Sequence, residues 1–352
     1  WIGRGGQGAF GAMAKATREH AAVLAAVSRS LGERQGAELA QASEDLRRLA
    51  ELGDPADVWP AVEPHLRSDF SAVRAAALPA AGAVAAAGGA AALRATLDLA
   101  ADRDRSVASA VAMAVAGLSP ATVTSSEAVA VATERLQEAD AWRVRAVAAY
   151  ALGRLARPPA NGSCSPLVAA AVATALRACL DDSSDEVRKA VLRELGTLAD
   201  AGCAEAVAAL VFAAAHHRTE VRKAAAPLLK KLRVAADKSV VARVVSLLEE
   251  DSWEVRFSAL FVLQRIAKAP DAAVFSAAAA RLSDDRSEVR GAAAETLRRL
   301  AAASEATGKR GGGSWREATT AALSARLTDE SPGVRAKASR ALCAVASPTD
   351  AA

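Results

Sequence analysis

Aromatic residues are scarce in this chain. They make up 3% of 352 residues, with one Tyr and six Phe, whereas hydrophobic residues make up 52%. β-Sheets rely on aromatic and β-branched side chains, so this scarcity argues against a sheet protein. Alanine supplies most of the apolar fraction, and alanine is the strongest helix former. The composition therefore predicts an all-α fold of closely packed helices.

Cysteine and histidine are also few. The four cysteines, Cys164, Cys179, Cys203 and Cys343, are widely spaced and form no C-x-x-C pair. The four histidines likewise lack a metal-ligand spacing, so we expect no disulfide framework, no metal site and no cofactor. Free thiols fit a reducing compartment, and we expect a cytoplasmic protein. The chain begins with Trp, which indicates a fragment, a processed form or an incomplete gene model, so any targeting signal upstream lies outside this sequence.

The charge balance is mild. Residues 1–176 hold 17 Lys/Arg and 17 Asp/Glu, and residues 177–352 hold 27 and 23, which gives the formal net charge of +4. This excess is small for a nucleic-acid-binding protein. Two stretches without charge, Ala75–Leu93 and Ser106–Ser126, are rich in alanine and interrupted by proline and glycine. We therefore expect buried helices there and no membrane span.

A Val-Arg dipeptide recurs along the chain. The spacings between its arginine positions are 34, 37, 43, 34, 34, 34 and 45 residues, where Val107-Ala108 stands in for one member. The two longest spacings contain Pro/Gly-rich segments near 157–165 and 304–314, which we interpret as insertion loops. The dipeptides are Val73-Arg74, Val144-Arg145, Val187-Arg188, Val221-Arg222, Val255-Arg256, Val289-Arg290 and Val334-Arg335. A fixed period of this length is typical of a repeat protein.

Each valine begins an apolar helix face. After Val255, apolar residues recur at Ala259, Leu263 and Ile266, the spacing of one side of a helix. A second apolar segment precedes each turn, for example Val240–Leu248, so the repeat predicts a pair of antiparallel helices. Turn sequences such as Asp251-x-x-Glu254 match a capping box and predict the helix start; Ser183-x-x-Glu186 and Asp285-x-x-Glu288 do the same.

An aspartate precedes several of these arginines by six positions. The pairs are Asp182 and Arg188, Asp284 and Arg290, and Asp329 and Arg335. Stacked repeats would then link aspartate and arginine in a ladder. If these ion pairs are exposed, each contributes about 0–1 kcal/mol, so Arg290→Ala should cost little more.

The pattern Asp-x-x-x-x-Val-Arg-x-x-Ala-x-x-x-Leu resembles HEAT repeats, especially the short variety found in bilin-lyase-like proteins. The resemblance covers about eight repeats, from Pro55 to Ala346. It implies an armadillo-type α-solenoid in which the second helix of each pair lines the concave face. A 34-residue period also suits tetratricopeptide repeats, but their Trp, Leu-Gly and Tyr pattern is missing.

The repeat also divides the chain. We expect a disordered glycine-rich segment over 1–16, a helical cap over 17–54, the repeat array over 55–346 and a tail over 347–352. The cap would cover the apolar end of the first repeat.

Basic residues align near the ends of three consecutive second helices. They are Lys230, Lys231, Arg265, Arg298 and Arg299, which we call the basic stripe. Helices pack about 8–10 Å apart, so the stripe would be roughly 20–30 Å long. Ordinary solvation explains such residues equally well. As a site, the stripe predicts a protein partner with an acidic segment, whereas the lack of interleaved aromatic residues argues against nucleic acid.

Two tryptophans share one register. Trp142 and Trp253 each stand two positions before a repeat valine. Each either covers the turn and packs on a neighbouring repeat or serves as an aromatic anchor for a partner. The sequence as a whole predicts a non-enzymatic scaffold that binds a protein on the concave surface. A bilin-lyase-like enzyme or subunit and a nucleic-acid-binding solenoid remain as alternatives.

Overall fold

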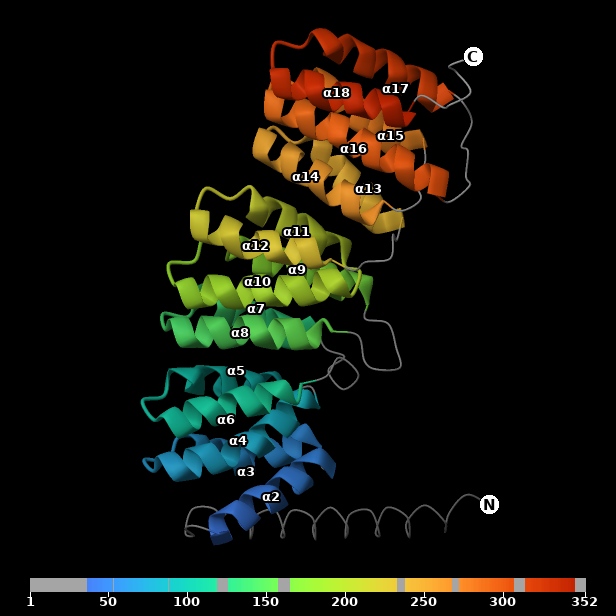
Figure 1. Ribbon diagram of the computed structural model, residues 1–352. Helices are drawn as coiled ribbons and strands as arrows, with labels where there is room; N and C mark the ends of the chain where they lie inside the picture. The colour runs from blue at the N-terminus through green and yellow to red at the C-terminus, as the bar shows by residue number, and fades with distance from the viewer. Residues whose placement is uncertain are drawn as a thin grey trace, which may run out of the picture. The chain divides into compact units, whose positions relative to one another are not determined.

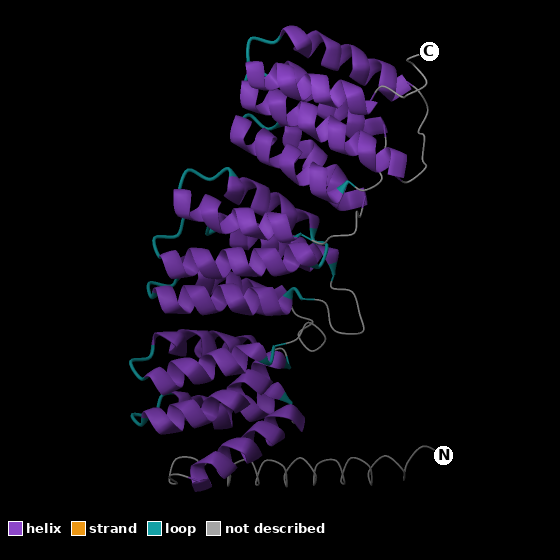
Figure 2. Ribbon diagram, viewed as in Figure 1, coloured by secondary structure: helices purple, strands orange, loops and turns teal. Residues whose placement is uncertain are grey.

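The computed structural model describes residues 37–52, 54–87, 89–118, 126–157, 165–232, 238–267, 272–306 and 314–345. Within these ranges all regular structure is helical, and turns join the helices (Figure 2). The prediction of an all-α fold is confirmed. Residues 1–36 and 346–352 lie outside the described residues, as do most of the two insertion loops, so the predictions for those segments stay predictions.

In the described chain, one helix, α2 (Ala37–Leu52), precedes eight helix pairs (Figure 1). The first helices of the pairs are α3 (Pro55–Leu66), α5 (Ala90–Asp98), α7 (Ser126–Glu138), α9 (Pro166–Ala178), α11 (Ala204–Ala214), α13 (Lys238–Ser246), α15 (Ala272–Ala280) and α17 (Ser314–Ala325). The second helices are α4 (Ser71–Ala86), α6 (Arg105–Ala116), α8 (Trp142–Leu155), α10 (Asp185–Asp200), α12 (Thr219–Lys231), α14 (Trp253–Ile266), α16 (Ser287–Ala306) and α18 (Pro332–Val345). A single 3₁₀ turn extends α5, α13, α15 and α17. The repeat period therefore corresponds to one helix pair, as predicted.

The core follows the apolar faces that the sequence indicates. Val255, Ala259, Leu263 and Ile266 of α14 are all buried, and every valine of the Val-Arg dipeptides is buried as well. The helices are short and rich in alanine, so much of their stability comes from packing against neighbours rather than from each pair alone. This packing fixes which side of each second helix remains exposed.

Two compact units divide the chain. The first comprises residues 1–165 with 181–191, and the second comprises 166–180 with 192–352. In the first unit, α2 packs on α4 and α4 packs on α6. A Cβ atom at Gly82 of α4 would come within 2.9 Å of the Ala114 Cβ atom of α6. Only a residue without a side chain allows the two helices to approach so closely.

In the second unit, α14, α16 and α18 lie side by side and pack in sequence order (Figure 1). The first helices of these pairs add a stacked aromatic contact, in which the rings of Phe275 and Trp315 lie 3.7 Å apart between centroids. Both side chains are buried. The few aromatic residues of the chain thus serve as core at this end.

The predicted capping boxes are wrong. Helix α14 is capped by Ser252, whose hydroxyl accepts the backbone N–H of Val255, and not by Asp251. Helices α10 and α16 begin two residues after the capping residues that we predicted, Ser183 and Asp285. The turn is longer because the aspartate before it accepts a backbone N–H two residues ahead, which holds the intervening residues outside the helix.

No helix of the described residues is long and apolar enough to cross a membrane. The two charge-free stretches are divided among separate helices. Ala75–Leu93 covers parts of α4 and α5, and Ser106–Ser126 begins within α6.

Candidate functional site

Every arginine of the Val-Arg dipeptides holds the turn that precedes its own helix. Its Nη1 atom donates to the backbone carbonyl oxygens six and five positions earlier. In α14, Arg256 donates to Glu250 and Asp251 at 2.9 and 2.8 Å. The same pair of bonds recurs at Arg74, Arg145, Arg188, Arg222, Arg290 and Arg335. The side chain therefore replaces backbone partners that a tight turn lacks.

Four of these arginines also reach the next repeat. The Nε and Nη2 atoms of Arg256 donate to both carboxylate oxygens of Asp284, at 2.8 and 2.9 Å. Arg290 holds Asp329 in the same way at 2.7 and 2.9 Å. The other two links join Arg74 to Asp102 and Arg145 to Asp182. The predicted ladder is confirmed, and each of its rungs is a bidentate ion pair between consecutive repeats.

The expectation that these pairs are exposed is wrong. Arg256, Arg290, Asp284 and Asp329 are all at most 8% exposed. The hydrogen bonds from Arg290 lower the pKa of Asp329 below its usual range, and those from Arg74 do the same for Asp102. Burial raises the pKa of Asp284, but the bonds from Arg256, the Arg286 N–H and Asp285 together outweigh burial, so this pKa is also lowered. The ladder is thus a buried ionic seam along the turns of the second helices.

At one step of the first unit the ladder has no rung, because both of its partners are replaced by alanine. The repeat that begins at Val107 carries Ala108 in place of arginine, and the following repeat carries Ala139 in place of aspartate. Both partners are missing from this step, so no buried charge is left without its counterpart.

At Arg222 the ladder is interrupted differently. The arginine is present, but the next repeat carries Glu250 at the aspartate position. Within the described residues Arg222 bonds to the His216 and His217 carbonyl oxygens and to the Thr219 hydroxyl, and to no carboxylate. We call the contact between α12 and α14 the interrupted step.

A pocket opens at the interrupted step. Helix α14 packs on α11 at this step. The cavity has a volume of about 550 Å³ and lies between the turn before α12 and the start of α14. Its walls combine the turn at Ala215 and His216, the Arg222 guanidinium, and Trp253 and Phe257 of α14. We call it the step pocket.

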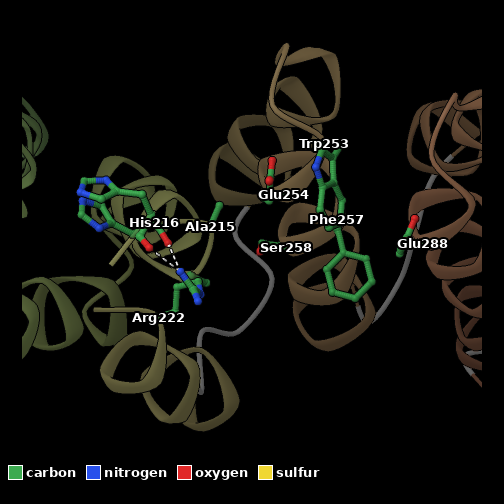
Figure 3. A pocket seen from close by; sticks show the side chains of 10 residues that line it. Ala215, His216, Arg222, Trp253, Glu254, Phe257, Ser258 and Glu288 are labelled. Atoms are coloured by element: carbon green, nitrogen blue, oxygen red, sulfur yellow. Dashed lines mark hydrogen bonds between the residues drawn. The ribbon is translucent and has the colours of Figure 1, made fainter. Parts of the chain in front are cut away.

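The step pocket has a basic side and an acidic side. Figure 3 shows Arg222 and His216 on the α12 side, Glu254 and Ser258 on α14, and Glu288 beyond Phe257. Glu254 accepts a hydrogen bond from Ser252, and Glu288 accepts one from Ser287. Phe257 is 39% exposed, so its ring adds apolar surface to the pocket. The pocket therefore offers one guanidinium, an apolar surface and a carboxylate rim.

The residues of the basic stripe lie on three second helices of the second unit. Lys231 is the exposed last residue of α12, and Lys230 precedes it. Arg265 is exposed on α14, and Arg298 and Arg299 lie on α16. The structure brings these three arginines onto two directly packed helices, α14 and α16.

One carboxylate moderates the charge of the stripe. Glu295 accepts hydrogen bonds from Arg298 and Arg299 on its own helix, at 2.7–3.0 Å. The bonds from Arg298, followed by those from Arg299, lower the pKa of Glu295 to about 2. It is therefore ionised at neutral pH and offsets part of the arginine charge. Glu295 was not predicted from the sequence, although a glutamate three or four positions before an arginine commonly pairs with it on a helix.

The two tryptophans have different surroundings. Trp142 is 44% exposed at the start of α8, and the guanidinium carbon of the adjacent Arg143 lies 5.6 Å from its ring centroid. Trp253 lines the step pocket, and the guanidinium carbon of Arg286 from the next repeat lies 5.8 Å from its ring. The structural and the binding role stay predictions for both tryptophans, and Trp253 borders the step pocket.

Comparisons with known proteins agree with the helix-pair repeat. Residues 172–264 match the family model of HEAT repeats, a segment that contains the interrupted step. No curated protein sequence matches the chain. The crystal structure of an engineered protein is similar over 92% of this chain and 89% of its own, with 23% identity and a TM-score of 0.38.

A crystal structure of importin beta is similar over 91% of this chain and 44% of its own, with 16% identity and a TM-score of 0.40. A second engineered protein is similar over 72% of this chain and 96% of its own, with 22% identity and a TM-score of 0.28. The eight helix pairs of the described chain, the periodic Val-Arg signature and the matched segment together make this fold a HEAT-like α-solenoid.

Proposed function

We propose that this chain is a non-enzymatic scaffold that holds a protein partner on the surface of its second helices. The observation that carries the proposal is the placement of Arg265, Arg298 and Arg299 on two packed helices, α14 and α16. Cations held by a rigid surface attract a segment rich in Asp and Glu without needing a pocket. In HEAT repeats, which this chain resembles, second helices line the concave face, and a segment bound there would be enclosed.

Glu295 makes the proposal specific. It bonds to both Arg298 and Arg299, so an acidic partner competes with it for the same donors. Removing its charge should therefore strengthen binding, while reversing the charge of two arginines should weaken it. A surface that serves only solubility predicts neither effect.

A labelled deca-glutamate peptide tests the proposal by fluorescence anisotropy. We expect the double variant Arg265→Glu, Arg298→Glu to bind at least about tenfold more weakly than the unmodified chain, and Glu295→Gln to bind more tightly. The matched control is Arg48→Glu, Arg67→Glu, which makes the same charge change at exposed sites on α2 and just after α3. Circular dichroism establishes that helicity is unchanged in all variants.

Two outcomes would contradict the proposal. If both double variants bind equally, net charge alone explains the affinity and the stripe is not a site. If single-stranded DNA binds tightly and the peptide does not, the partner is nucleic acid, and the affinity will fall steeply with salt. The bilin-lyase-like alternative stays a prediction of the sequence resemblance.

A further inference from the structure

The interrupted step contains an arginine, Arg222, whose counterparts at the four rungs of the ladder share one ligand geometry. At the two rungs that follow it in the second unit, Nε and Nη2 of the arginine bind both oxygens of an aspartate at 2.7–2.9 Å. Arg222 has the same bonds from Nη1 to its own turn, so its guanidinium is held by the same anchor. Its Nη2 atom donates to the Thr219 hydroxyl at 2.9 Å. A carboxylate is the ligand that this guanidinium receives elsewhere in the array.

We propose that the step pocket binds an extended segment of a partner protein that supplies this carboxylate from an Asp or Glu side chain, with an apolar side chain packed on Trp253 and Phe257. The proposal rests on the proposed function as a protein-binding scaffold but names a different site. The carboxylate takes the place that Asp284 and Asp329 occupy at the neighbouring rungs.

The chemistry of the pocket selects the occupant. A guanidinium binds a carboxylate with two parallel hydrogen bonds, and a partly enclosed site strengthens them. An exposed phenylalanine beside a tryptophan is the kind of surface on which binding energy concentrates. The carboxylates of Glu254 and Glu288 line the same pocket and repel a uniformly acidic segment. A single acid next to an apolar residue therefore fits, and a run of acids does not.

Distance sets the spacing of the two anchors. Adjacent helices of a solenoid lie about 8–10 Å apart. An extended chain advances about 3.3 Å per residue, so an acid and an apolar side chain with two residues between them lie about 10 Å apart.

Fluorescence anisotropy with four labelled nonapeptides tests the proposal. The probe carries Asp and Leu separated by two Gly/Ser residues, and the others replace Asp by Asn, replace Leu by Ser, or replace every residue by Glu. We expect the Asn and Ser peptides to bind at least about tenfold more weakly than the probe, the loss of one charge-assisted bond pair or one buried side chain. Equal affinity for the Asp and Asn peptides, or no binding of the probe, overturns the proposal.

Variants of the chain locate the site. We expect Arg222→Gln to lose the probe, Arg222→Lys to retain part of the affinity because it keeps the charge, and Phe257→Ser to weaken binding about tenfold. Phe257 is exposed, so its substitution tests the pocket even if changes at Arg222 loosen the turn. Unchanged affinity in both Arg222→Gln and Phe257→Ser overturns the assignment to this pocket.

The stripe variants separate this inference from the proposed function. Arg265→Glu, Arg298→Glu should leave the Asp-Leu probe bound while weakening deca-glutamate, and Phe257→Ser should do the reverse. If the stripe variant alone loses both peptides, the scaffold proposal stands and the step pocket is not a docking site. If neither peptide binds the unmodified chain, both proposals fail.

Discussion

Two steps of the second unit differ at the aspartate position of the ladder and in the cavity beside their helices. Between α14 and α16, Arg256 meets Asp284 and the helices lie in contact. Between α12 and α14, Arg222 faces a repeat with Glu250 in place of aspartate, and the step pocket separates the helices. Glutamate carries the same charge but is longer by one methylene. The comparison indicates that a carboxylate at this position does not by itself link two repeats. Its side chain must also have the length of aspartate.

The aspartate is suited to this position because it has two tasks. Its carboxylate accepts the guanidinium of the previous repeat and the backbone N–H two residues ahead in its own turn. Asp284 accepts from the Arg286 N–H at 3.1 Å, and Asp329 from Ser331 at 3.0 Å. At the equivalent position in the turn before α12, the Nδ1 atom of His216 accepts the Arg218 N–H at 3.2 Å. Histidine thus reproduces the turn bond with a neutral ring nitrogen, without offering a carboxylate to an arginine.

The largest loss of stability is expected from removing one rung of the ladder. Asp284→Ala removes the carboxylate that binds the buried Arg256 guanidinium through two bonds and leaves it only the exposed Asp285, so the free energy of unfolding should fall by about 3–5 kcal/mol. Urea denaturation followed by circular dichroism measures the loss. Amide hydrogen exchange should also accelerate at the start of α16, as the step opens. A loss below about 1 kcal/mol would mean that the rung behaves as a surface pair.

Removing core volume beside the ladder should cost nearly as much. Leu297 of α16 is fully buried, and Leu297→Ala should lower the free energy of unfolding by about 2–5 kcal/mol because it leaves a cavity. The matched control is Leu327→Ala, at a side chain that is 42% exposed and should change stability by no more than about 0.5 kcal/mol. Equal losses at the two leucines would contradict the burial pattern.

Acid should weaken the closed steps by a smaller amount. The bonds from Arg290 lower the pKa of Asp329 in the folded chain, so the unfolded chain binds the proton more readily. The stabilisation is complete above the unfolded pKa of about 3.9 and disappears as the pH falls through the lower folded value. Thermal midpoints measured from pH 7 downward should therefore fall more steeply below about pH 4 in the unmodified chain than in Asp329→Asn. Parallel curves would exclude the rung as a source of acid sensitivity.

The smallest change should be a gain in stability at the interrupted step. Glu250→Asp restores the side chain found at four closed rungs, and one new charge-assisted link should raise the free energy of unfolding by about 1 kcal/mol. The same variant should weaken the Asp-Leu peptide, because the internal carboxylate now competes for Arg222. Glu249→Asp, at the exposed neighbouring position, is the control for both measurements. Tighter peptide binding in Glu250→Asp would contradict the idea that the introduced aspartate and the aspartate of the peptide compete for Arg222.

Much of the fold was available from the sequence because its periodicity is chemical as well as numerical. Each Val-Arg dipeptide identifies a buried valine and a turn-holding arginine, so the eight helix pairs and the ladder follow from one pattern. The burial of the ladder was harder to predict. Arginine and aspartate are usually exposed, and only the packing of consecutive turns shows that Arg290 and Asp329 are enclosed.

The candidate sites were partly predictable. Alignment of the repeats identified the arginines of the basic stripe but overlooked Glu295, which bonds to two of them. Trp253 was recognised by its register, whereas Arg222 looked like every other repeat arginine. The signal that could have revealed it is Glu250, since an alignment on the valines shows that aspartate is replaced there while the preceding arginine is kept. The step pocket could not be predicted from the sequence, because it depends on how the helices pack.

The ladder has a direction, from each arginine to the aspartate one repeat later, and this direction makes the array extendable. A tandem duplication of residues 253–286 would place a second Arg256 six positions after the first Asp284, next to the same two carbonyl oxygens that now receive Arg290. The copied Asp284 would in turn receive the copied arginine. Insertion of one such unit would leave every rung of the ladder with both of its partners, so the ladder can lengthen by whole repeats.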